Sequence, residues 1–333
     1  LVFLMSIGVY FYKKTANLED YLIGGRAMGS WVTALSAQAS DMSGWLLMGL
    51  PGAVYLGGLS QAWIAVGLFV GTVLNWKFVA ARLRVYTEKT NSMTLPSYFE
   101  DRFGDQTGLL RIISATIILL FFTIYSASGL VASGKLFESL FNIEYTAAVI
   151  FGGLAIVLYT FLGGFMAVSW TDFFQGILMF FAITIVPLIA YGEIGGLNEI
   201  VEMTAENGVS LSLMPEGITF TAVISALAWG LGYFGQPHIL ARFMGIDTIK
   251  KVAPARKIAV IWVAISLSAA VMVGIIAVPM FPEIADSEKV FIEMIASVFN
   301  PWLGGILLAA ILSAIMSTID SQLLVSSSTF TED

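Results

Sequence analysis

The stretch Ser36-Ala37-Gln38-Ala39-Ser40-Asp41-Met42-Ser43-Gly44-Trp45 interrupts an apolar segment that runs from about residue 31 to 55. It holds a carboxylate, three serines, a glutamine and a glycine, and none of these favours contact with lipid. In the hydrocarbon region an unsatisfied polar group costs several kcal/mol, because no water is present to bond it. Such an interruption is tolerated only where it lines a protein cavity or holds an ion. The stretch therefore predicts a broken membrane-spanning helix that forms part of a binding site.

The composition surrounding this stretch is that of a membrane protein. Apolar residues make up 58% of the 333 and charged residues only 12%, and the mean hydropathy is +0.87. Soluble domains carry roughly 45–50% apolar and about 25% charged residues. The absence of cysteine excludes disulfides and thiolate metal sites, and a single histidine excludes a histidine-rich one. The lack of a long basic run argues against nucleic acid as a partner.

About nine apolar runs are long enough to be crossings of roughly 20 residues, the first of them truncated. They are 1–12, 30–56, 60–81, 108–137, 145–163, 169–192, 218–244, 257–281 and 301–328. Of the 16 Lys and Arg residues, all but Lys135 and Lys289 fall on one set of alternate loops, Arg242 included, and we expect that side to be cytoplasmic. Region 86–107 predicts a short interfacial helix with Pro96 near its start. The chain begins inside an apolar run without Met, so we expect a piece of a longer protein.

The last span carries hydroxyl groups at helical spacing. Ala314, Ser317 and Thr318 lie at positions i, i+3 and i+4, so they share one helical face. Such hydroxyls can bond to their own helix or join two helices, and they can also coordinate an alkali ion. A second interrupted helix in the same chain favours the cation site.

The span 218–244 contains Trp229-Gly230-Leu231-Gly232-Tyr233-Phe234-Gly235-Gln236-Pro237-His238, whose glycines and proline predict a kink or an unwound turn. Trp229 and Tyr233 lie four residues apart, and this spacing fits either ordinary packing or contact with a solute. Their position near mid-span favours the solute. We expect His238 to be a structural, hydrogen-bonded residue.

A third polar stretch, 163–175, lies between two predicted spans. A Gly-Gly turn followed by Thr171 and Asp172 fits a tight cytoplasmic loop in which the carboxylate is stabilised at a helix N-terminus. It fits equally well a functional carboxylate.

These stretches together resemble the sodium/solute symporter family. Residues 163–175, Gly-Gly-Phe-Met-Ala-Val-Ser-Trp-Thr-Asp-Phe-Phe-Gln, resemble its signature, and 39–52 closely resemble the corresponding helix of bacterial members that transport proline. The similarity continues through 121–125, 229–244 and 316–324 and covers essentially the whole chain. Asp320 departs from the pattern of those members, in which an uncharged residue stands there.

The resemblance implies a LeuT-like inverted-repeat fold, all-α and polytopic, in a single transmembrane domain that is incomplete at its C-terminal end. Residues 30–192 would form the first five-helix repeat and 218–333 part of the second. The implied sodium ligands are Ala39, Met42, Ala314, Ser317 and Thr318. The implied solute contacts are Ser43, Gly44, Trp45, Tyr125, Trp229, Tyr233 and Pro237. Asp41 would tune the ion site, and Asp172 would lie on the cytoplasmic release path.

The implied activity is sodium-coupled symport of a small amino acid, with L-proline as the expected solute, across the bacterial cell membrane. The implied partners are Na+, the solute and the lipid bilayer, and no enzymatic activity is expected. A symporter of pantothenate, a sugar or a compatible solute stays open as an alternative, as does a transporter-like sensor domain. A channel is disfavoured, because the broken helices pair as an ion site rather than as a pore-lining ring. The oligomeric state is left open.

Overall fold

The first interrupted helix comprises α3 (Ser30–Gly44), a π-helical turn η2 (Trp45–Gly49) and α4 (Leu50–Gly57) in a computed structural model that describes residues 2–160 and 164–333. The break predicted from the sequence is confirmed and falls at Ser43, whose φ of 51° and ψ of −172° are not helical. The Ser43 hydroxyl oxygen accepts a hydrogen bond of 3.1 Å from the Trp45 amide, which also donates to the Met42 carbonyl in a tightened turn.

The second interrupted helix comprises α12 (Phe220–Leu227), a 3-10 segment η4 (Ala228–Phe234) and α13 (Pro237–Gly245). Proline fits the start of α13, because the first turn of a helix has no partner for its N–H groups. The predicted kink is therefore present. Gly230 allows η4 to lie directly on α5, because a Cβ atom there would run into the carbonyl of Gly67.

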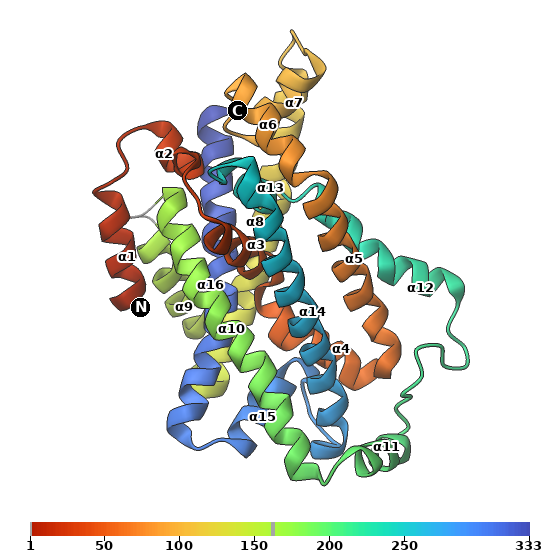
Figure 1. Ribbon diagram of the computed structural model, residues 1–333. Coiled ribbons are helices and arrows are strands. Elements are labelled where there is room, and N and C mark those ends of the chain that lie inside the picture. The colour runs from red at the N-terminus through yellow and green to blue at the C-terminus, as the bar shows by residue number, and fades with distance from the viewer. Residues whose placement is uncertain (1, 161–163) are drawn as a thin grey trace.

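While α12 lies at the edge of the bundle beside α5, the other described helices pack around α3 (Figure 1). They are α1 (Val2–Tyr12), α2 (Leu18–Ile23), α5 (Ala62–Phe78), α6 (Ala80–Thr90), α7 (Leu95–Phe103), α8 (Leu109–Phe141), α9 (Tyr145–Thr160), α10 (Gly164–Ile194), α11 (Leu197–Glu206), α14 (Ile249–Met280), α15 (Val290–Val298) and α16 (Pro301–Glu332), with short 3-10 turns η1 (Gly24–Arg26), η3 (Gly58–Gln61) and η5 (Ser287–Lys289).

Long apolar helices make up most of the described chain. Those with the length and composition to cross a membrane lie within Ser30–Phe78, Leu109–Phe141, Gly164–Ile194, Ile249–Met280 and Pro301–Glu332, and shorter apolar helices are Val2–Tyr12, Tyr145–Leu154 and Phe220–Phe234. The segment Ser30–Phe78 turns back at η3, so α4 and α5 run in opposite directions (Figure 1). The count of nine spans and the division into two repeats stay predictions.

One helix boundary differs from the one expected. The helix predicted to start at 169 begins at Gly164, so Asp172 lies well inside α10 rather than in a loop or at a helix N-terminus. The predicted position of Pro96 in the first turn of α7 is confirmed, with Thr94 capping that helix. Gly163, the first residue of the family-like signature and the end of the predicted span 145–163, lies outside the described residues.

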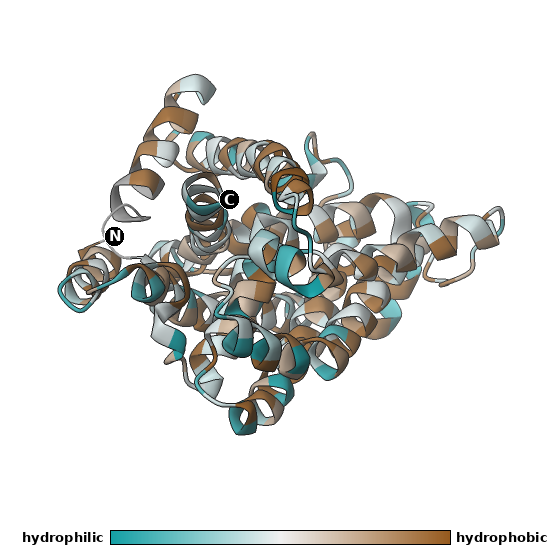
Figure 2. Cartoon of the chain, turned by 90° about the horizontal axis from the view of Figure 1, so that it is seen from above, coloured by the Kyte–Doolittle hydropathy of each residue, from teal (hydrophilic) through white to brown (hydrophobic). Residues whose placement is uncertain are grey.

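The buried core lies where α3 packs between α10, α14 and α16. Gly176 allows α10 to approach α3 closely, since a Cβ there would lie only 3.3 Å from that of Ala39. On the periphery, Ile117, Phe121 and Ile124 of α8 are each more than half exposed. Apolar residues dominate the helices and polar ones their connections (Figure 2), as expected for a bundle surrounded by lipid.

The Lys and Arg residues of the connections lie mainly at one end of the bundle, around α6, α7 and the start of α14, whose positions Figure 1 shows. We take this end as cytoplasmic, as the positive-inside rule predicts. Arg242 is an exception to the expected loop position: it lies within α13 and is completely buried.

Candidate functional site

A cavity of about 560 Å³ lies beside the break in α3. Residues of η2, α8, the second interrupted helix and α16 line it, and it reaches Glu288 of η5 at the outer end of the bundle. The residues predicted for the solute that line it are Ser43, Gly44, Trp45, Tyr125 and Trp229. The structure therefore brings predicted solute contacts from three separate helical segments to one space.

Aromatic rings form one wall of this cavity. The rings of Trp45 and Trp229 lie 5.3 Å apart between centroids, inclined by 32°. The Tyr125 hydroxyl donates a hydrogen bond of 3.3 Å to the Asp41 carbonyl, which ties α8 to the end of α3. The wall therefore offers a flat apolar surface with polar groups only at its margin.

Two residues predicted for the solute lie outside the lining. Tyr233 is buried with only 2% exposure, and its carbonyl accepts a 2.9 Å hydrogen bond from the Asn75 side chain. Pro237 borders a much smaller space on the cytoplasmic side, next to Ile118 and Leu324. Conversely, the cavity lining includes residues outside the predicted site: Met48, Gly49, Ser128, Gly129, Val131, Ala132, Gln236, Glu288 and Ile315.

An oxygen cluster joins α3 to α16 next to the cavity. The Ser317 hydroxyl donates to the Ala39 carbonyl at 2.9 Å and lies 3.2 Å from the Ala314 carbonyl. Thr318 Oγ1 donates to the same Ala314 carbonyl at 3.1 Å, and Thr318 also lines the cavity. Four of the five residues predicted to bind sodium thus place their oxygens together.

Met42, the fifth of these residues, lies at the end of the regular part of α3. Its carbonyl accepts the Trp45 amide in a tightened turn, and its side chain is buried. Asp41 precedes it, 8% exposed, and its carboxylate lies next to the Tyr233 hydroxyl. Asp41 is therefore behind the cavity wall, close to the break.

Carboxylates do not form the cluster. Within residues 2–160 and 164–333, no group of three or more His, Cys, Asp or Glu side chains is arranged to hold a metal ion. Carbonyl and hydroxyl oxygens are hard ligands of the kind that an alkali ion accepts. The oxygen cluster of Ala39, Ala314, Ser317 and Thr318 can supply such ligands.

Asp172 forms a buried ion pair with Arg242, and both side chains have 0% exposure. Arg242 Nη2 donates to Asp172 Oδ2 at 3.0 Å and to Ser321 Oγ at 2.5 Å. Its Nε donates to Ser36 Oγ at 3.0 Å, and this hydroxyl donates to Asp172 Oδ2 at 2.7 Å. The pair and its serines therefore join α3, α10, α13 and α16 at a level nearer the cytoplasm than the cavity.

Two further arginines hold the far end of α13. Arg84 of α6 donates from Nε to the Ile246 carbonyl at 2.5 Å and from Nη2 to the Asp247 carbonyl at 2.9 Å. Arg26 of η1 donates from Nη1 to the Met244 carbonyl at 3.0 Å. Burial, together with the nearby charge of Arg84, lowers the pKa of Arg26 below its ordinary value.

His238 differs in part from the expectation, and Asp320, the departure from the family pattern, is buried. His238 is buried as expected, but neither ring nitrogen has a hydrogen-bond partner in the described part of the chain. Its ring packs edge-on against Phe122, with 5.4 Å between centroids, so its structural role rests on packing. Asp320 is buried in α16, and its Oδ1 accepts a 3.2 Å hydrogen bond from the Ser321 hydroxyl.

A membrane bundle with two interrupted helices beside one cavity defines a secondary transporter of the kind that alternates access around a central site. The sequence pattern of the Sodium:solute symporter family matches residues 21–333, and the chain belongs to this family. It is an integral membrane protein, as predicted.

Curated relatives are about 50% identical to this chain over the residues that align. It is 52% identical to the sodium/proline symporter of Escherichia coli (strain K12) over 339 residues, covering 99% of this chain and 68% of the relative. It is 52% identical to the sodium/proline symporter of Haemophilus influenzae over 99% of this chain and 68% of the relative. It is 48% identical to the sodium/proline symporter of Staphylococcus aureus (strain NCTC 8325 / PS 47), and the alignment covers 99% of this chain and 65% of the relative.

Two solved structures have a similar fold. The substrate-bound, outward-open state of a Na+-coupled sialic acid symporter gives a TM-score of 0.83 at 20% identity, covering 99% of this chain and 72% of the other. A nucleobase-cation-symport-1 family transporter in a closed conformation gives a TM-score of 0.56 at 16% identity, covering 95% of this chain and 70% of the other. The prediction of an all-α, LeuT-like transporter fold is confirmed.

Proposed function

We propose that this protein couples the uptake of a small amino acid, L-proline, to the entry of sodium. One observation carries the proposal: Thr318 belongs both to the cavity lining and to the oxygen cluster shared by α3 and α16. A solute in the cavity and an ion in the cluster would therefore be neighbours. The names of the curated relatives support this choice of ion and solute.

The proposed sodium ligands are the carbonyl oxygens of Ala39, Met42 and Ala314 and the hydroxyl oxygens of Ser317 and Thr318. The hydroxyls presently donate to two of those carbonyls at 2.9 and 3.1 Å. An ion would replace these hydrogen bonds by turning the hydroxyl lone pairs inward. Because the ligands come from both α3 and α16, the affinity for the ion depends on how those helices are held together.

The proposed solute lies in the cavity with its apolar ring against Trp45 and Trp229. The backbone near Ser43 has left the helical hydrogen-bond pattern, so its amide groups can bond a carboxylate. Ser43, Gly44 and Tyr125 complete the contacts. Tyr233 and Pro237 would act from behind the lining, Tyr233 through Asp41 and Pro237 by starting α13.

The energy available is sufficient for concentrative uptake. One elementary charge that crosses 100 mV releases about 2.3 kcal/mol. A tenfold sodium gradient adds about 1.4 kcal/mol. With one sodium per solute, the sum supports a solute accumulation of roughly several hundredfold.

The route to the cytoplasm would pass the ion pair between Asp172 and Arg242. The Oδ1 atom of Asp172 has no hydrogen-bond partner among the described residues, so the carboxylate keeps an acceptor for a passing ion. The pair closes the inner side, while the cavity lining extends to Glu288 at the outer end. We therefore assign the structure to an outward-facing stage of the cycle.

Counterflow in proteoliposomes tests the proposal. We expect labelled L-proline to exchange across the membrane with sodium and to stop when choline replaces sodium. Competition with other amino acids, pantothenate, sugars and compatible solutes defines the solute, because a cavity of about 560 Å³ has room for larger molecules. Sodium-independent exchange would contradict the coupling, and binding without exchange would support the sensor alternative.

A further inference from the structure

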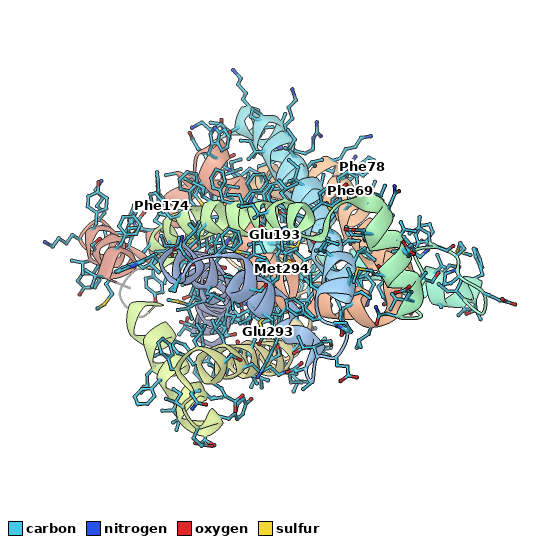
Figure 3. All side chains as sticks on the ribbon, turned by 90° about the horizontal axis from the view of Figure 1, so that it is seen from below. Phe69, Phe78, Phe174, Glu193, Glu293 and Met294 are labelled. Carbon is cyan, nitrogen blue, oxygen red and sulfur yellow. The ribbon has the colours of Figure 1, made fainter. Side chains whose placement is uncertain are left out.

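A groove of about 630 Å³ lies between α1 and α10, far from the cavity described above. Its walls are mostly apolar and aromatic and include Ile7 and Phe11 of α1 and Trp170 and Phe174 of α10. The rings of Phe11 and Trp170 are stacked at 6.4 Å between centroids. Figure 3 shows Phe174 on the side of α10 toward α1, where it meets the Phe3 ring at 5.0 Å.

A cationic group stands at one end of this groove. Lys14 lines it, and its Nζ donates a 2.6 Å hydrogen bond to the Tyr10 hydroxyl while lying 4.4 Å from the centre of the Tyr10 ring. Lys13 is its exposed neighbour. Within the described residues neither lysine has a carboxylate within 4.0 Å. Two uncompensated positive charges therefore face the end that we take as cytoplasmic.

The two faces of α10 are chemically different at this level. Trp170 and Phe174 lie one turn apart and face the groove, whereas Asp172 between them faces inward and is completely buried. Trp170 belongs to the family-like signature, yet the proposed transport site does not use it. The groove accounts for this residue.

We propose that the groove binds an anionic phospholipid. Its phosphate lies at Lys13 and Lys14, and one acyl chain follows Ile7, Trp170 and Phe174. Lysines at the cytoplasmic interface attract anionic headgroups, and aromatic rings favour the same level of the bilayer. A zwitterionic headgroup carries its own cation beside the phosphate, which weakens the attraction to the lysine pair.

Native mass spectrometry of the purified protein, exchanged into mixtures of phosphatidylglycerol and phosphatidylethanolamine, tests the proposal. We expect the protein to retain phosphatidylglycerol in preference. The double variant Lys13→Gln/Lys14→Gln should lose roughly tenfold or more of that preference. The matched control is Lys250→Gln/Lys257→Gln, which removes the same charge from two exposed cytoplasmic lysines away from the groove and should leave the preference unchanged.

A second variant, Ile7→Trp, tests whether the acyl chain binds in the groove. It fills the groove without changing its charge. We expect this variant to retain less of both lipids. Equal phosphatidylglycerol retention in the wild type and in Lys13→Gln/Lys14→Gln would overturn the headgroup assignment, as would an equal loss in the control. Unchanged lipid retention by Ile7→Trp, or self-association of the chain through this face, would overturn the groove assignment.

Discussion

Two groups of buried arginines contact the same short helix, α13, in different ways. Arg242 projects from α13 itself and binds Asp172 of α10 and serines of α3 and α16, so all its helix-to-helix contacts are made by side chains. Arg26 and Arg84 lie outside α13 and bind carbonyl oxygens at its C-terminal end. Met244 lies in the last turn of α13, where the helix dipole favours a cation, and Ile246 and Asp247 directly follow the helix.

We infer from this difference that the contacts of Arg242 can open during transport, whereas those of Arg26 and Arg84 stay closed. Side-chain contacts across four helices can break without unwinding any of them, whereas carbonyl contacts at residues 244–247 hold the backbone of α13 to η1 and α6. A parallel bridge between Met28 and Ile246 reinforces the second set. If the cavity empties to the cytoplasm, we expect α13 to move together with η1 and α6, away from α10 and α16.

The strongest test of this comparison is Arg242→Met. It leaves the Asp172 carboxylate buried without its cation, which typically costs about 3–5 kcal/mol. We expect a large fall in the unfolding temperature in detergent. The 333 residues contain no cysteine, so Ala241→Cys on the cytoplasmic side of α13 can report opening. Its rate of thiol labelling should rise when Arg242 is replaced.

The matched control is the neutral double variant Asp172→Asn/Arg242→Gln. It keeps hydrogen-bonding groups at both positions and removes the unpaired charge, so it should recover part of the lost stability. If the double variant were as unstable as Arg242→Met, the loss would come from packing rather than from the ion pair.

A smaller effect is expected for Arg84→Met. Two carbonyl oxygens lose a charged donor, which should cost about 1.5–3 kcal/mol in all. No carboxylate is left buried without a partner, because Glu88, which pairs with Arg84, is 58% exposed. The unfolding temperature should fall, but the labelling of Ala241→Cys under native conditions should match that of the wild type. Faster labelling, as in Arg242→Met, would remove the distinction between the two groups of arginines.

The sequence contained the break in the first helix but not its full arrangement. The polar run in an apolar span predicted that α3 is interrupted, because polar groups buried in the membrane without hydrogen-bond partners cost free energy. The interruption consists of one non-helical residue, Ser43, followed by a π-helical turn. This detail depends on packing against α16, which the local sequence does not encode. The hydroxyl pair on α16 was visible from its spacing, whereas its approach to Ala39 came only from family likeness.

Arg242 shows where sequence reasoning reached its limit. An arginine near the end of a predicted span has the appearance of a loop cation, and its partner Asp172 is 70 residues away. A weak signal existed, since Arg242 lies four residues after His238 on a helix started by Pro237, and an arginine facing inward requires a counter-charge. Without a three-dimensional arrangement, no rule selects Asp172 from the carboxylates available.

A comparison within α16 sharpens the assignment of the two sites. Ser321→Ala removes a partner of Arg242, and Thr318→Ala removes a proposed sodium ligand one turn away. Each change should cost about 1 kcal/mol, or roughly a fivefold change in an equilibrium. We expect Ser321→Ala to raise labelling of Ala241→Cys, and Thr318→Ala to raise the sodium concentration needed for half-maximal proline uptake. The same outcome for both variants would mean that the ion site and the inner closure are not separate.

The smallest effect is expected at a third ion cluster, on the outer end, where Lys135 of α8 lies 3.1 Å from Asp286 and 2.5 Å from Glu288. Lys135 and Asp286 are 26% and 33% exposed, so the Asp286 pair should contribute less than about 1 kcal/mol. Burial opposes ionisation of Asp286, but hydrogen bonds from Lys135 and the Glu288 amide and nearby lysine charges bring its pKa below the ordinary value of 3.8.

A lowered pKa means that ionised Asp286 stabilises the folded state above about pH 4 and that this contribution disappears as the pH falls through its folded-state value. The difference in unfolding temperature between the wild type and Asp286→Asn should therefore be small at pH 7 and should shrink as the pH falls below the ordinary pKa of 3.8. It should also vanish at about 1 M salt, where charges are screened within roughly 3 Å. The difference between the wild type and Arg242→Met should persist at high salt, because that ion pair is buried. Equal salt sensitivity would mean that both clusters are in contact with water. The ion pair between Asp172 and Arg242 would then not close the cytoplasmic side of the cavity.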